Sequence, residues 1–213
     1  MRWYITYKLS YRDLRDMMAE RGINLAHSTV LRWVQCYVRE FEKKWNRYAR
    51  PVGSSWRVDE TYIRVKGEWS YLYRAVDRQG NTIDFLLSEH RDIEAAKRFF
   101  TRAIDKQGAP EKITLDGYAA THSAMAELKK SGMLPQQVVV RTSKYLNNLI
   151  EQDHRRVKQR VYPMLGFKKF WNAADTMSGI ELAHKIKKGQ FDITGLGLDK
   201  WKVPQVREAV LAA

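Results

Sequence analysis

The stretch Trp56-Arg57-Val58-Asp59-Glu60-Thr61-Tyr62-Ile63-Arg64-Val65 decides how the rest of the chain is interpreted. Apolar and polar side chains alternate along it, which is the two-residue period of a β-strand. Asp59 stands inside this predicted strand, where aspartate is disfavoured. Such an acid is either an edge residue in an ion pair or a side chain kept for chemistry, and the stretch alone leaves both open.

Residues 50–55, with the sequence Arg-Pro-Val-Gly-Ser-Ser, form a turn-rich linker before this strand. The period before the linker is helical. Ser10 with Asp13 three residues later fits a variant of the capping box that begins a helix, and Gly22 is expected to end that helix. A second helix is expected to begin at His27 or Ser28, and its apolar stripe comprises Val30, Trp33, Val34, Tyr37, Val38 and Phe41.

Two helices joined by a glycine-containing turn are typical of a helix-turn-helix. In that interpretation Ser28, Thr29 and Arg32 lie at the exposed start of the second helix and contact DNA. The alternative is an ordinary helical hairpin that packs on the next domain, and the local pattern does not decide between the two.

Beyond the linker the pattern predicts strands at 56–65, 69–76, 82–87, 112–115 and 137–141, and helices at 92–106, 119–130, 147–161 and 172–187. This order predicts an α/β fold with a mixed sheet flanked by helices, and it matches the ribonuclease H-like architecture. We therefore expect a helix-turn-helix segment at 1–50, a ribonuclease H-like catalytic domain at 55–190 and a C-terminal tail at 191–213.

Three acids stand at places that suit a metal site. Asp59 lies within the first predicted strand, Asp116 directly follows the fourth, and Glu151 lies near the start of the helix after the fifth. If the first and fourth strands are neighbours, the two aspartates come side by side and the helix brings Glu151 over them. Carboxylates that close repel unless a cation neutralises them or one is protonated, and Mg²⁺ prefers oxygen ligands.

Each acid also has an ordinary structural explanation. Asp59 could be a salt-bridge partner, Asp116 precedes Gly117 as in a common turn, and Glu151 near a helix start is favoured by the helix dipole. Neighbouring acids are expected to be structural, and Glu60 should point to the opposite face of the strand from Asp59. These structural neighbours are Glu60, Asp77 and Asp153.

The predicted helix 147–161 places cations next to an acid. Glu151, His154, Arg155 and Lys158 follow the spacing i, i+3, i+4 and i+7, so they are expected to share one face. That face would offer a carboxylate to a metal ion and cations to a phosphate backbone. A surface ion pair between Glu151 and Arg155 is the alternative, but it leaves the further positive charge of the segment unexplained.

The charge of the chain is uneven. Residues 1–50 carry 11 Lys and Arg against 5 Asp and Glu, residues 51–140 carry 13 against 12, and residues 141–190 carry 11 against 4. Two basic regions around a nearly neutral one suggest that both ends of the chain bind a polyanion such as nucleic acid.

The sequence has no long apolar run that would predict a membrane span and no signal peptide, so we expect a cytoplasmic protein. Cys36 is the single cysteine, which excludes an internal disulfide and a cysteine-based zinc cluster. We expect its thiol to be reduced and its side chain partly buried.

Several blocks in this order resemble the bacterial insertion-sequence transposases with an Asp-Asp-Glu catalytic site, and most closely insertion-sequence family six. The segments 27–34, 56–62, 69–77 and 147–154 carry the resemblance, with weaker support from 165–168 and 179–181. Asp59, Asp116 and Glu151 take the three acid positions, and Lys158 takes the family's basic position. The 34 residues between the second and third acids are the spacing such transposases favour.

The resemblance implies a DNA transposase in which Asp59, Asp116 and Glu151 are both catalytic and the ligands of two Mg²⁺ or Mn²⁺ ions. It implies cleavage of 3′ strands at the element's terminal inverted repeats and joining to target DNA, by a homodimer or larger assembly that is associated with the nucleoid when bound. His154, Arg155 and Lys158 would contact phosphates. The alternatives are a transposase-derived DNA-binding protein or repressor that no longer cuts, and a hydrolytic nuclease of the same fold.

Overall fold

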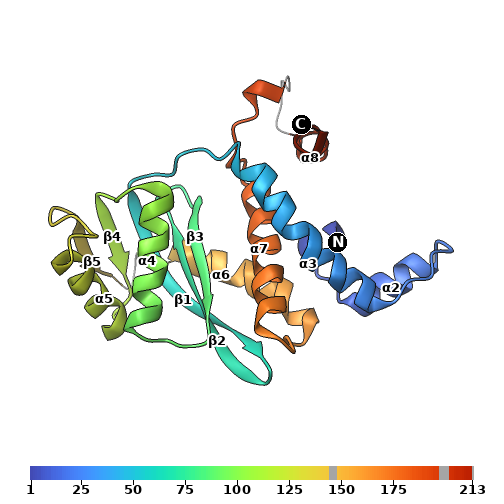
Figure 1. The fold of residues 1–213 in the computed structure, drawn as a ribbon, viewed down its shortest axis with the longest axis horizontal. Helices are drawn as coiled ribbons and strands as arrows, with labels where there is room; N and C mark the ends of the chain where they lie inside the picture. The colour runs from blue at the N-terminus through green and yellow to red at the C-terminus, as the bar shows by residue number, and fades with distance from the viewer. Residues whose placement is uncertain (144–147, 197–201, 213) are drawn as a thin grey trace. The chain divides into compact units, whose positions relative to one another are not determined.

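The computed structural model describes residues 1–143, 148–196 and 202–212, and Figure 1 shows the order of their helices and strands. The chain divides into two compact units. One comprises 51–64 and 68–156 and is called the sheet unit; the other comprises 1–50, 65–67 and 157–213 and is called the helical unit. Within the described ranges, no helix is both long enough and apolar enough to cross a membrane.

The sheet unit is built on a five-stranded mixed sheet with the order β3-β2-β1-β4-β5. Strands β2 and β3 are antiparallel, whereas β4 is parallel to both β1 and β5. The order and directions confirm the predicted ribonuclease H-like arrangement. The strands are β1 (Ser55–Val65), β2 (Glu68–Val76), β3 (Thr82–Ser88), β4 (Lys112–Leu115) and β5 (Val139–Thr142).

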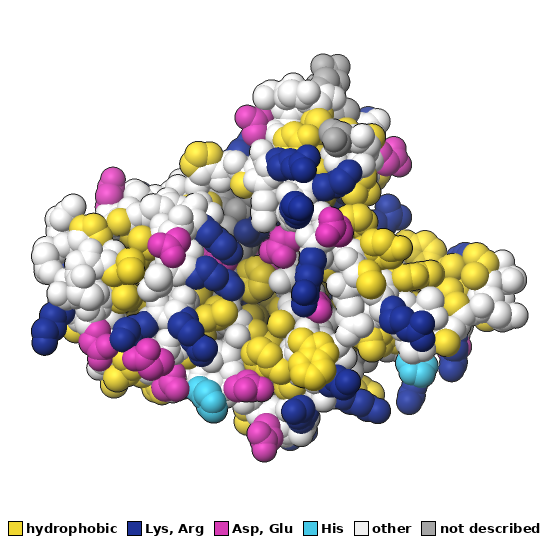
Figure 2. All heavy atoms as spheres, in the orientation of Figure 1, with side chains coloured by type: hydrophobic (Ala, Val, Ile, Leu, Met, Phe, Trp, Pro, Cys, Tyr) yellow, Lys and Arg dark blue, Asp and Glu magenta, His cyan; other side chains and the backbone are white. Residues whose placement is uncertain are grey.

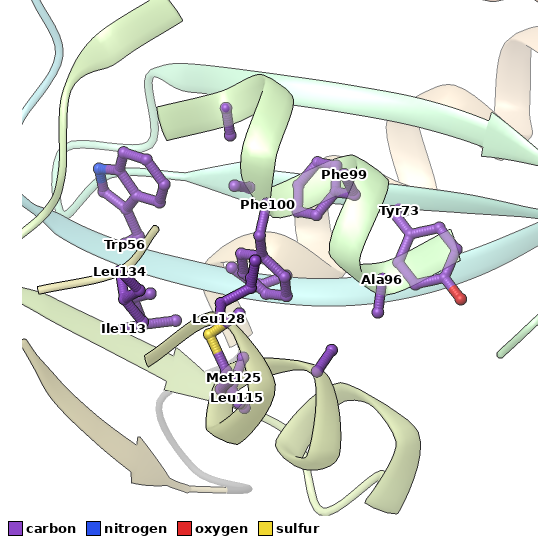
Figure 3. Packing of buried hydrophobic residues seen from close by; sticks show 14 of the residues in the cluster. Trp56, Tyr73, Ala96, Phe99, Phe100, Ile113, Leu115, Met125, Leu128 and Leu134 are labelled. Carbon is purple, nitrogen blue, oxygen red and sulfur yellow. The ribbon is translucent and has the colours of Figure 1, made fainter. Parts of the chain in front are cut away.

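Helices α4 (Ile93–Gln107) and α5 (Ala119–Lys130) pack on one face of this sheet. The Asp92 side chain begins α4 by accepting a hydrogen bond from the Ala95 backbone N–H at 2.7 Å. Because side chains alternate between the two faces of β1, Trp56 and Val58 both point toward these helices. Figure 3 shows the resulting core, whose large members include Trp56, Tyr73, Phe99, Phe100, Ile113, Leu115, Met125, Leu128 and Leu134.

Helices that lie wholly within the described part of the helical unit are α1 (Arg2–Thr6), α2 (Tyr11–Ala19), α3 (His27–Asn46), α7 (Phe170–Lys187) and α8 (Val203–Ala212). Ser10 and Asp13 form the predicted capping box at α2. At Gly179 of α7 a Cβ atom would lie 2.9 Å from the Ile5 side chain and 3.0 Å from that of Val38, so glycine allows α1 and α3 to approach α7 closely.

Helix α6 (Asn148–Val161) spans the boundary between the two units, and two short 3₁₀ helices lie at Tyr162–Met164 and Thr194–Leu196. The packing units differ from the segments expected from the sequence, because α7 packs with α1 and α3 in the helical unit. The tail contains α8, whose apolar side chains pack in a cluster with Trp45. As functional domains, the limits 1–50, 55–190 and 191–213 stay a prediction.

The apolar stripe expected on α3 is only partly buried. Val30, Val34 and Val38 lie in the core, as predicted, but Trp33 and Tyr37 are exposed. Cys36 is also exposed, so the expectation of a partly buried thiol was wrong. Apolar residues spaced by three and four positions form a wide stripe on a helix surface. A single packed neighbour covers only the middle of that stripe, so the residues on its two edges remain exposed to solvent.

Candidate active site

Asp59 and Asp116 come together because their strands are parallel neighbours. The register pairs Arg57 with Thr114, and two further residues along both strands bring Asp59 opposite Asp116. One carboxylate oxygen from each, together with one from Glu60, lies within 4.8 Å of the others. The predicted adjacency of the two aspartates is therefore present, and Glu60 joins them in one group of acids.

Asp59 is held in surroundings that disfavour its negative charge. Burial raises the pKa of Asp59 to about 7, and repulsion from Asp116, Glu60 and Glu151 acts in the same direction. The Glu60 backbone N–H opposes the shift by donating a 2.8 Å hydrogen bond to Asp59 Oδ1. A proton or a metal cation at this position would relieve the repulsion.

Helix α6 brings two further side chains to the region. Glu151 lies in its first turn, is exposed, and is near enough to Asp59 to raise its pKa. His154 is buried, and its Nδ1 lies 3.6 Å from Asp59 Oδ2. The face predicted for α6 is thus divided: Arg155 and Lys158 are exposed with Glu151, whereas His154 is buried. Contact of His154, Arg155 and Lys158 with DNA phosphates stays a prediction.

Glu60 is the residue of this site that sequence reasoning missed. Its Oε2 accepts a 2.8 Å hydrogen bond from Arg91 Nη2 and its Oε1 accepts one of 2.8 Å from Thr121 Oγ1. These partners lie before α4 and on α5, so Glu60 does face away from Asp59 and α6, as alternation predicts. The alternation gave the right face, but it did not indicate that the longer glutamate side chain remains close to both aspartates.

Arg91 connects Glu60 to the loop that carries Asp116. Its Nη2 lies 4.0 Å from Asp116 Oδ2, and its guanidinium carbon lies 3.6 Å from the centre of the Tyr118 ring. The Tyr118 hydroxyl donates to the Arg91 carbonyl at 3.0 Å, and the Tyr118 backbone N–H donates to Asp116 Oδ1 at 3.2 Å. These contacts hold the Asp116 side chain in one orientation.

The other two neighbouring acids are structural, as predicted. Asp77 accepts hydrogen bonds from the backbone N–H groups of Gly53, Gln79 and Asn81, and so fixes the turn between β2 and β3. Asp153 pairs with Arg74 at 3.0 Å in a buried ion pair that joins α6 to β2.

The donor set fits a hard divalent cation. Its converging ligand atoms are carboxylate oxygens, which Mg²⁺ and Mn²⁺ accept, and Asp59 and Asp116 keep side-chain exposures of 18% and 30% that leave room for water and substrate oxygens. Within the described residues, this group of Asp59, Glu60 and Asp116 is where three potential ligands converge. Glu151 is not part of this group of three, although it acts on the charge of Asp59.

The residues predicted to read DNA lie at the start of α3, in the helical unit. Arg32 is exposed, while Ser28 and Thr29 are half-buried. Helix α3 begins after Ala26, whose side chain makes no capping hydrogen bond. Contact of these three residues with DNA stays a prediction. Figure 2 shows Lys and Arg side chains spread widely over the face in view.

Comparison with known families gives a match that spans all three candidate acids. The family model DDE_Tnp_IS240, described as a DDE domain, matches residues 53–190. The transposase for insertion sequence-like element IS431mec of Staphylococcus aureus (strain N315) is 43% identical over 186 residues, which cover 87% of this chain and 81% of that protein. The chain belongs to the transposases of insertion-sequence family six.

A second relative agrees with this assignment. The transposase for insertion sequence element IS257 in transposon Tn4003 of Staphylococcus aureus is 42% identical, with the same coverage of 87% and 81%. Among solved structures, the catalytic core domain of HTLV-2 integrase in complex with magnesium (trimeric form) is 16% identical. It covers 62% of this chain and 86% of that chain, with a TM-score of 0.47. This transposase is a polynucleotidyl transferase that serves DNA transposition.

Proposed function

We propose that this transposase cleaves the 3′ strands at the ends of its insertion sequence and joins them to target DNA, with Asp59, Asp116 and Glu151 as the catalytic acids. The observation that carries the proposal is the close approach of Asp59 and Asp116, with Glu151 near enough to raise the pKa of Asp59. Carboxylates this close together repel unless one of them is protonated or a cation neutralises them, and a shared metal ion would supply that cation.

The three acids would hold two Mg²⁺ or Mn²⁺ ions. When bound, the ions would supply activation of the attacking oxygen and stabilisation of the leaving oxygen in an in-line phosphoryl transfer. Asp59 and Asp116 stand on neighbouring strands, so the sheet fixes their separation. Glu151 stands on α6, whose first turns are tied to β2 by the buried pair of Arg74 and Asp153.

The protein's own contribution is positioning and charge. His154 lies against Asp59 and, together with the Glu60 backbone N–H, restricts the orientation of its carboxylate. The exposed cations Arg155 and Lys158 follow Glu151 by one and two turns of α6 and would neutralise DNA phosphates. Ser28, Thr29 and Arg32 would contact the terminal inverted repeats. No side chain is required to form a covalent intermediate.

The proposed partners are DNA ends, target DNA and further copies of this chain. Joining both ends of an element to one target requires two active sites to act together, so we expect a homodimer or larger assembly on DNA. Action on DNA is supported by the two relatives, which are transposases of insertion sequences.

The experiment incubates the purified chain with Mn²⁺ and labelled element-end DNA, and scores cleavage and joining as separate products. We expect nicked 3′ ends and strand-transfer products, both lost in EDTA. Binding without cutting would contradict the proposal in favour of a silent DNA-binding protein or repressor. Released fragments without joined products would contradict it in favour of a hydrolytic nuclease.

A further inference from the structure

Three exposed side chains on the hairpin of β1 and β2 form a surface that has no role in the proposed cleavage and joining reactions. Tyr62 and Arg64 lie on β1 and Trp69 lies on β2; we call these three residues the hairpin patch. The ring centres of Tyr62 and Trp69 are 4.7 Å apart in an edge-to-face arrangement, and the Arg64 guanidinium carbon lies 5.2 Å from the Trp69 ring centre. Tyr62 is 49% exposed and Trp69 52% exposed, so both rings offer surface to a ligand.

The hairpin holds these side chains on a regular backbone. Lys66 and Gly67 have φ angles of 54° and 86°, as a two-residue type I′ turn requires. Such a turn places Arg64 opposite Trp69 and leaves Tyr62 diagonal to it on the same face. Figure 1 shows that the hairpin extends beyond α4 and α5, so these helices leave this end of the sheet face uncovered.

The patch lies on the same face of β1 as Glu60, the acid that adjoins Asp59 and Asp116. Tyr62 follows Glu60 by two residues on one face of β1, which is about 7 Å along a strand. Glu60 itself has an oxygen within 4.8 Å of Asp59 and Asp116. Stacked nucleotides in one DNA strand are about 3.4 Å apart along the axis. A strand whose phosphate lies at the acids would therefore bring bases a few nucleotides away to the patch.

The chemistry of the patch selects one kind of occupant. Exposed aromatic rings beside an arginine bind unpaired nucleobases by stacking and by cation–π contact, while the arginine also attracts the phosphate backbone. Arg91, with 34% of its side chain exposed, adds a second cation beside Glu60. Paired bases in a duplex present no free faces to such rings.

We propose that the hairpin patch stacks unpaired nucleobases of the DNA strand whose phosphate is held at the acids. The inference rests on the proposed function, because that function places the phosphate there. It adds that DNA next to the cleaved bond is bound in a locally unpaired state, and it makes Trp69 and Tyr62 the residues that bind it.

The test uses the full chain in EDTA, so that no cutting occurs, and a short single strand that carries 2-aminopurine. The fluorescence of this base falls when it stacks on an aromatic side chain. We expect Trp69→Ala to weaken single-strand binding by about fivefold or more and to reduce the quenching, with a larger loss in the Tyr62→Ala/Trp69→Ala double variant. Trp69→Phe should keep most of both, and all variants should bind fully paired DNA as the wild type does.

Trp171 provides the matched control. It is 53% exposed and lies beside a cation, since Lys169 Nζ is 5.1 Å from its ring centre, but it belongs to the helical unit. Trp171→Ala should therefore keep full binding and quenching. Thermal melting of each variant checks that the chain is folded, which is expected because Trp69 and Trp171 are both exposed.

Three results would overturn the inference: unchanged binding and quenching in the double variant, an equal loss in Trp171→Ala, or an assembly that falls to monomers in the double variant while single-strand binding stays intact. The last would make the patch an interface between copies. Because the assay excludes metal, quenching that depends on Trp69 would stand even if the chain never cut DNA. Conversely, the wild-type chain could cut and join DNA while the Trp69→Ala variant still quenches 2-aminopurine as the wild type does. That result would refute base stacking on the hairpin patch and leave the proposed function intact.

Discussion

Two groups of charged side chains in the sheet unit show how differently one fold can treat buried charge. Arg74 and Asp153 form a 3.0 Å pair whose side chains are 0% and 7% exposed, so each charge is neutralised by the protein. In the group of acids formed by Asp59, Glu60 and Asp116, the carboxylates of the two aspartates lie close together. Arg91 is 4.0 Å from Asp116, but its guanidinium donates its hydrogen bond to Glu60. The first group holds the fold together, and the second is left for a cation from outside.

The largest expected effect is the loss of catalysis when an acid of the candidate active site is replaced. Asp59→Asn keeps the shape of the side chain but removes one anionic ligand, so cleavage and joining should fall by roughly a thousandfold or more. Binding of end DNA should stay within about twofold, because the cations are untouched. Gel-shift and strand-transfer assays on the same preparation measure both, and joining at the wild-type rate would refute the role of Asp59.

The matched change in the other group should act on stability. Asp153→Ala leaves the Arg74 guanidinium buried without its partner carboxylate, which should lower the free energy of unfolding by about 3–5 kcal/mol. Urea denaturation followed by circular dichroism measures the loss. The double variant Arg74→Met/Asp153→Leu should recover much of it, because no charge is then buried; a single variant as stable as the wild type would show that the pair is not structural.

Arg91 links the acid group to its surroundings, so its substitution sharpens the comparison. Arg91→Lys keeps the charge but loses the planar stacking on Tyr118 and the fork directed at Glu60. We expect turnover to fall by about tenfold with the affinity for DNA unchanged, because Asp116 loses its orientation. The control is Arg102→Lys, an arginine that pairs with Asp84 in the same unit, and it should leave turnover within about twofold.

The raised pKa of Asp59 predicts a pH-dependent stability without metal. Because the folded carboxyl has a pKa of about 7 and its ordinary value is 3.8, its ionisation costs stability progressively as pH rises between these values, and fully above pH 7. Asp59→Asn removes the cost, so in EDTA it should raise the Tm by a few degrees at pH 8 and by almost nothing at pH 4. Thermal scans at both values measure this, and an equal shift at both would contradict it.

The smallest effects belong to the cations of α6. Arg155→Gln and Lys158→Gln should each weaken DNA binding about equally for all sequences and reduce the slope of log affinity against log salt by about one. Fluorescence anisotropy at several salt concentrations gives the slope. Gln159→Ala, an exposed neutral neighbour on the same helix, should leave it unchanged. An unchanged slope in both charge variants would exclude α6 from the DNA-binding surface.

Much of the acid group could be predicted because it follows from local rules. A strand with an aspartate inside it, and a second aspartate just after a short strand, are visible in the sequence, and strand adjacency then brings Asp59 to Asp116. The Ser10 capping box and the strand order were likewise confirmed. These features depend on neighbours in sequence or on a common sheet topology.

What the sequence did not reveal depends on tertiary contacts. Helical spacing grouped His154 with Glu151, but spacing does not say which edge of a stripe turns inward, and His154 lies against Asp59. Arg91 precedes α4 in a loop and reaches Glu60 only in the folded chain. Trp33 shows the reverse case, an apolar side chain at helical spacing that stays 37% exposed.

The most direct test of the acid group is diffraction from crystals of this chain soaked in Mn²⁺, with the anomalous signal of manganese locating the ions. We expect a peak between the carboxylates of Asp59 and Asp116, with Glu151 as a further ligand, and loss of that peak in Asp59→Asn. Manganese bound elsewhere, with no peak at these two aspartates in a chain that cuts DNA, would show that Asp59 and Asp116 do not hold the catalytic metal.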